Sequence, residues 1–134
     1  MEHYTEFLPI SRADMEARGW DQLDFVVVGG DAYVDHPSFG TAIISRLLEA
    51  EGYKVGVLAQ PRYTDCEDFK RFGKPKYGFF IGGGNVDSMV SHYSVAKIPR
   101  AEDEYSPGGI GGARPDRSAT VYTRLAKEAY PDLL

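Results

Sequence analysis

Residues 24–40 read Asp24-Phe25-Val26-Val27-Val28-Gly29-Gly30-Asp31-Ala32-Tyr33-Val34-Asp35-His36-Pro37-Ser38-Phe39-Gly40. The first part of this stretch is uncharged after Asp24, and its three consecutive valines cannot alternate between core and water. Such a run is typical of a strand that is buried on both faces, in a parallel sheet with helices on either side. Functional groups in these sheets gather at the carboxyl ends of the strands. Four polar or ionisable side chains follow this strand directly, and we expect them at that edge: Asp31, Tyr33, Asp35 and His36.

The segments after this strand predict a βαβ unit and a third strand. A helix is expected from about Ser38 to Ala50, followed by strands over 53–59 and 76–81. The helix carries apolar residues at i, i+3 and i+4 spacing on one face, the pattern of an amphipathic helix: Ile43, Ile44, Leu47 and Leu48. Because Lys54 suits an edge strand, the order 3-1-2 is predicted, with the valine-rich strand central.

The remaining segments are expected to complete a single α/β domain over residues 1–134. Residues 1–20 form an N-terminal arm with a helix capped near Ser11 and closed by Gly19, which we expect to pack across the sheet. Short helices are predicted over 65–72 and 86–95, and a last helix over 119–130 that Ser118 opens. The Gly- and Pro-rich stretch 97–117 has the length and composition of a lid or binding loop. The alternation of strands and helices predicts another strand after the last helix, so the sheet is expected to be incomplete at its C-terminal end.

Composition bounds the function. The net charge of −5 argues against non-specific nucleic-acid binding, which needs a basic footprint. No apolar run reaches the roughly 18 residues of a membrane span, and residues 1–6 show no secretory signal, so a cytoplasmic location is expected. Cys66 is the only cysteine, which excludes an internal disulfide and a cysteine-only metal site within this chain.

A second polar group follows the third predicted strand. It contains Asn85, Asp87 and His92. Together with Asp31, Asp35 and His36 these side chains are expected to form one cleft at the carboxyl edge, beside the loop 106–112. Carboxylates and imidazoles would suit a divalent metal, although Asp31 and Asp35 are also typical turn-capping residues. Two glycine clusters would let backbone amides approach a phosphate: the pair at 29–30 and the triplet at 82–84. Neither cluster has the spacing of a dinucleotide-binding or P-loop motif.

Several longer motifs resemble a known family. They are Phe7-Leu8-Pro9-Ile10-Ser11-Arg12, Gly19-Trp20-Asp21, Gly30 to Gly40, Ala59-Gln60-Pro61, Gly83 to Val90, His92-Tyr93, Tyr105 to Gly109 and Arg114-Pro115-Asp116-Arg117. They closely resemble the N-terminal domain of YgiQ-type radical S-adenosylmethionine (radical SAM) proteins over nearly the whole chain. The resemblance implies a three-layer Rossmann or flavodoxin-like fold, similar to the cobalamin-binding domains that precede some radical SAM barrels. The cobalamin-ligating pattern D-x-H-x-x-G is absent, because Asp35 and His36 are adjacent.

The resemblance also implies what a full-length relative contains. Family members continue into a radical SAM barrel, where three cysteines of a C-x-x-x-C-x-x-C motif hold a [4Fe-4S] cluster that binds S-adenosylmethionine. This chain has none of those cysteines, and Cys66 matches no cluster ligand. The leading hypothesis is therefore an accessory domain whose edge, residues 31–36 and 85–93, faces the substrate side of the barrel. The alternatives are a free-standing module that binds a phosphorylated or nucleotide ligand, and a small metal-dependent hydrolase.

Overall fold

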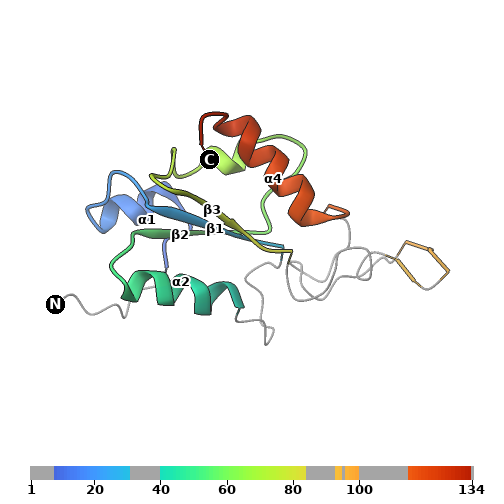
Figure 1. Cartoon of the computed structure of the whole chain (residues 1–134), viewed down its shortest axis with the longest axis horizontal. Helices are drawn as coiled ribbons and strands as arrows, with labels where there is room; N and C mark the ends of the chain where they lie inside the picture. Colours follow the sequence, from blue (N-terminus) through green and yellow to red (C-terminus); the bar gives the residue numbers. More distant parts are fainter. Residues whose placement is uncertain (1–7, 31–39, 84–92, 95, 100–114, 134) are drawn as a thin grey trace.

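The computed structural model describes residues 8–30, 40–83, 93–94, 96–99 and 115–133. Within these residues, three parallel strands form one sheet: β1 (Phe25–Gly29), β2 (Val55–Ala59) and β3 (Gly78–Ile81). The strand order is β2-β1-β3, so the prediction of a central β1 is confirmed. Helix α2 (Gly40–Ala50) covers one face of the sheet and helix α4 (Ser118–Ala129) covers the other, as Figure 1 shows. The chain is therefore a three-layer α/β fold, as the sequence predicts.

The central strand owes its position to its valines. Val26, Val27 and Val28 are at most 3% exposed. Val27 pairs with Val57 on one side and with Phe80 on the other, in parallel register. A strand whose successive side chains are all apolar is stable only where both faces are covered, and here α2 and α4 supply the two covers.

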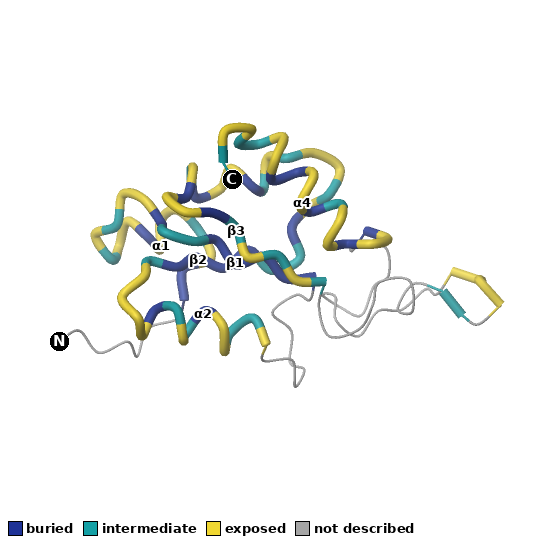
Figure 2. Tube along the Cα trace, in the orientation of Figure 1, coloured by how far each residue is buried: buried dark blue, intermediate teal, exposed yellow. Residues whose placement is uncertain are grey.

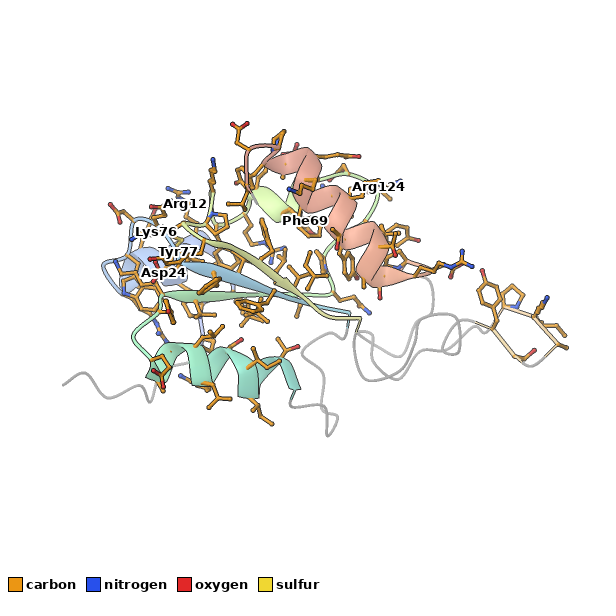
Figure 3. The ribbon with its side chains drawn as sticks, viewed as in Figure 1. Arg12, Asp24, Phe69, Lys76, Tyr77 and Arg124 are labelled. Carbon is orange, nitrogen blue, oxygen red and sulfur yellow. The ribbon has the colours of Figure 1, made fainter. Side chains whose placement is uncertain are left out.

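The α4 side of the sheet holds the main hydrophobic core. Val26, Val28 and Leu58 pack there with Tyr122 and Leu125 of α4. Buried residues concentrate along the strands and the inner side of α4 in Figure 2. Phe69 fills the space between α4 and the sheet, with its ring centre 5.9 Å from that of Tyr122 (Figure 3). This face follows the usual rule that a helix buries its apolar side.

Helix α2 departs from that rule. Its amphipathic pattern would place Ile43, Ile44 and Leu47 on the sheet, but all three are exposed. Ser45 and Glu49 face inward instead and are buried. Glu49 is held there by two arginines: Arg18 Nη1 lies 2.9 Å from Oε2, and Arg46 Nη1 lies 2.7 Å from Oε1. A buried carboxylate is stable only beside opposite charges. These two ion pairs therefore favour the rotation of α2 that points Glu49 inward and the apolar residues outward.

The N-terminal arm lies along the sheet edge rather than across a face. Helix α1 (Arg12–Ala17) begins at the predicted cap, where Ser11 Oγ accepts a hydrogen bond from the Asp14 N–H. Ahead of it, the Pro9 carbonyl accepts a hydrogen bond of 2.8 Å from the Val57 N–H. The arm therefore pairs with the outer edge of β2, and the helix inserts Met15 into the core on the α4 side.

The helix predicted over 65–72 is reduced to one 3₁₀ turn, η1 (Asp68–Lys70). Side-chain carboxylates explain the difference. Asp65 Oδ1 accepts a hydrogen bond from the Glu67 N–H, and Asp68 Oδ2 accepts one from the Arg62 N–H. Such local bonds compete with the helical backbone ladder, so a regular α-helix does not form.

Other predicted segments fall largely outside the described residues, including most of 86–95 and of the loop 97–117. At the end of the first, Tyr93 forms an isolated antiparallel bridge with Pro99, so a helix reaching residue 95 is contradicted at that position. The last helix is confirmed, but Ser118 is its first residue and does not cap it: Arg117 occupies the N-cap position without a side-chain cap. Among the described helices, none is long and apolar enough to cross a membrane.

Candidate functional site

The candidate site is the carboxyl edge of the sheet, where β1 and β3 end side by side. Val28 of β1 pairs with Ile81 of β3, and the Gly82 N–H extends this pairing by donating to the Val28 carbonyl at 2.8 Å. Gly30 and Gly83 are the last described residues before the two segments that carry the predicted site. The seven predicted side chains all lie outside the described residues: Asp31, Tyr33, Asp35, His36, Asn85, Asp87 and His92.

Gln60 joins the ends of β2 and β1 at this edge. Its backbone N–H donates to the Gly29 carbonyl at 2.8 Å, and its side-chain Nε2 donates to the Gly30 carbonyl at 3.2 Å. Its φ of 44° lies in the left-handed region, which costs a residue with a side chain about 1–3 kcal/mol. Backbone strain of this kind often marks a functional site, so Gln60 is a candidate that the sequence analysis did not select. The sequence signal was the Ala59-Gln60-Pro61 motif, which is one of the motifs that carry the family resemblance.

The N-terminal end of α4 meets the same edge. Ser118 is 2% exposed, and its hydroxyl donates a 3.3 Å hydrogen bond to the Gly83 carbonyl. A Cβ atom on Gly83 would lie 3.4 Å from that hydroxyl, which is an ordinary van der Waals distance. The hydrogen bond from Ser118 therefore ties the N-terminal end of α4 to the residue that ends the described part of the β3 segment.

Tyr93 and Asp116 link two of the motifs that carry the family resemblance. The Tyr93 hydroxyl donates a 2.8 Å hydrogen bond to Asp116 Oδ2. This bond, together with the negative charge of Asp116, raises the pKa of Tyr93 above its ordinary value of 10.0, because the phenolate would face a carboxylate. The contact ties the end of the segment 85–93 to the residues just before α4, 23 positions later in the chain.

The described residues do not supply the ligands of an iron–sulfur cluster. Such a cluster needs several thiolates, whereas Cys66 is the only cysteine and lies half-buried against the α4-side core. Within the part of the chain that the structure describes, no three His, Cys, Asp or Glu side chains stand close enough to hold a metal ion. The donor set in this chain therefore does not fit the cluster that radical SAM proteins carry.

The parallel sheet covered by helices on both faces defines an α/β domain of the open, doubly wound class. In the sequence, polar segments follow its neighbouring strands β1 and β3. The chain belongs to the family described as "Radical SAM N-terminal", whose model matches residues 7–134. This confirms the family resemblance that the sequence motifs indicated.

The chain is similar to bacterial proteins described as UPF0313 proteins. A UPF0313 protein of Clostridium botulinum (strain Loch Maree / Type A3) is 60% identical over 127 residues, which cover 95% of this chain and 20% of the relative. A UPF0313 protein of Clostridium perfringens (strain SM101 / Type A) is 56% identical over 129 residues, covering 96% and 20%. The chain thus spans about a fifth of the length of these relatives. No solved structure gives a significant match.

Proposed function

We propose that this chain is an accessory N-terminal domain of a radical SAM iron–sulfur enzyme, and that the carboxyl edge of its sheet faces the substrate side of a radical SAM barrel in the same polypeptide. In this proposal the barrel holds the [4Fe-4S] cluster and S-adenosylmethionine, since this chain lacks the thiolates. The domain itself contributes binding groups and no cluster ligand. The family membership and the fivefold greater length of the relatives support this division of roles.

One observation carries the placement of the site: the two polar segments leave adjacent parallel strands at the same edge. Asp31 follows Gly30 directly, and Asn85 stands two positions after Gly83. The described residues before these segments, Gly30 and Gly83, lie at this edge, and the spacing of about 3.8 Å between consecutive Cα atoms supports placing the start of both segments there. Ligands of open α/β sheets bind there, so we propose that Asp31, Asp35, His36 and their counterparts after β3 contact the substrate.

The test uses the full-length protein and compares Asp35→Ala and His36→Ala with Arg124→Ala, a control on the exposed side of α4. The proposal expects the first two variants to lose most activity or substrate binding while the melting temperature stays unchanged, because both residues follow β1 rather than support it. The control should retain both properties. Full activity in correctly folded Asp35→Ala and His36→Ala variants would contradict the placement of the site.

The same variants separate the alternatives. A module that binds a phosphorylated or nucleotide ligand would bind that ligand without a barrel, and the Asp35 and His36 variants would weaken this binding. A small metal-dependent hydrolase would show metal-dependent turnover in this chain alone. Either result would replace the accessory role as the function of the domain.

A further inference from the structure

The outer side of α2 is an apolar surface that the described part of the chain leaves uncovered. Ile43 is 57% exposed and Leu47 is 63% exposed. Since residues four apart lie on the same side of a helix, these two side chains form one ridge. Beside the ridge lies an open hollow of about 580 Å³, lined by Ala42, Ile43, Arg46 and Leu47. We refer to this ridge and hollow as the α2 outer face.

The rotation of α2 shows that this exposure follows from built-in contacts. The opposite side of the helix carries Glu49, which is fully engaged by Arg18 and Arg46. Turning Ile43 and Leu47 onto the sheet would carry this carboxylate out toward water and break its ion pair with the buried Arg18. The sequence thus places a paired charge toward the sheet and large aliphatic residues away from it, an arrangement that suits a helix between two layers.

A second exposed apolar group lies on the same side of the sheet, over β3. Phe80 is exposed, and its ring centre is 4.9 Å from that of Phe25. Tyr53 and Tyr77 pack on Phe25 at 5.2 and 5.4 Å and are also exposed (Tyr77 is labelled in Figure 3). Helix α2 contacts mainly β2 and β1, and Phe80 of β3 stays 43% exposed on this face. The whole α2 side therefore presents more exposed apolar surface than the α4 side, whose core is covered.

We infer that the α2 outer face is the docking surface for the remainder of the full-length polypeptide, the part that the relatives carry beyond the matched fifth. This rests on the proposed role as one domain of a longer chain. The relatives are about five times as long as the match, so a covalently attached partner is present at high effective concentration. Among the described residues that line the hollow, Arg46 is the charged one, and it is paired with Glu49. The surface therefore fits an apolar patch of a neighbouring domain better than a charged partner.

The experiment places a photocrosslinking side chain on this surface in the purified full-length protein. The variant is Leu47→p-benzoylphenylalanine, and the matched control is Arg124→p-benzoylphenylalanine. Leu47 is 63% exposed, and the Arg124 side chain is 66% exposed but belongs to α4, which covers the opposite face of the sheet. After irradiation, peptide mapping by mass spectrometry identifies the partner of each crosslink. We expect the Leu47 variant to crosslink within one polypeptide to residues beyond 134, and the Arg124 variant to lack that product.

Four outcomes would overturn the inference. The first is a crosslinked dimer, which would make a second copy the occupant, and the second is a set of crosslinks confined to residues 1–134. The others are the absence of a crosslink at position 47 and equal crosslink yields at positions 47 and 124. The readout does not depend on activity, so it separates this inference from the proposed site. If the crosslink is absent but Asp35→Ala still impairs activity, the docking inference fails and the proposed substrate edge stands. If the crosslink forms as expected but the Asp35→Ala and His36→Ala variants are fully active, the proposed substrate edge fails and the docking inference stands.

Discussion

Replacing Glu49 with methionine tests the charge arrangement that sets the rotation of α2. The Glu49 side chain is 4% exposed, and its two oxygens contact Arg18 at 2.9 Å and Arg46 at 2.7 Å. The Arg18 side chain is itself only 8% exposed, so Glu49→Met takes away the carboxylate that lies 2.9 Å from a buried guanidinium. Removing one partner of a buried ion pair costs about 3–5 kcal/mol, a large share of the 5–15 kcal/mol that stabilises a typical domain.

Urea unfolding, followed by circular dichroism, measures this loss as a lower midpoint at unchanged slope. Arg46→Met is the matched control. The Arg46 side chain is 41% exposed, and Glu49 keeps Arg18 as a partner after this change, so the loss should be smaller than that of Glu49→Met. The double variant Arg18→Met/Glu49→Met should recover most of the loss, because apolar replacements of a buried pair are often neutral. Recovery should be incomplete, since the Arg18 guanidinium also lies 5.0 Å from the Trp20 ring. A Glu49→Met loss no larger than that of Arg46→Met would refute the reasoning.

Three further predictions concern packing, titration and cluster binding. Gly56→Ala should destabilise the fold by about 1–3 kcal/mol in the same assay, because its Cβ would lie 2.5 Å from Leu23 Cδ1, whereas Gly40→Ala meets nothing within 4 Å and should cause no loss. The Tyr93 phenol should ionise above pH 10.0, and the stability that its bond to Asp116 contributes should be present below that pH and lost as the pH rises through the raised pKa. Ultraviolet titration against Tyr93→Phe measures this, and ionisation at or below 10.0 would contradict it. Anaerobic reconstitution of residues 1–134 should yield no iron–sulfur absorbance, and stoichiometric bound iron and sulfide would show that the single cysteine is no obstacle.

The strand order could be predicted from the sequence because it depends on a local property. Val26, Val27 and Val28 are apolar in succession, and only a central, doubly covered strand satisfies all three. The boundaries of α4 and the cap of α1 at Ser11 were predictable for the same reason, since apolar periodicity and capping act over a few neighbouring residues. The family was also recognisable from the sequence, because its motifs are short contiguous stretches of residues.

Long-range contacts decided what local patterns could not. The rotation of α2 depends on Arg18, 31 positions before Glu49, and no periodicity within the helix reveals that partner. The short η1 reflects competition from carboxylates, and the strained Gln60 reflects the meeting of two strand ends 30 positions apart. The sequence predicted that polar residues after β1 and β3 form a site and that the two strands are neighbours, and the tertiary structure supplied the register of this adjacency. That adjacency arises from pairing between residues more than 50 positions apart, such as Val28 and Ile81, which only the folded sheet brings together.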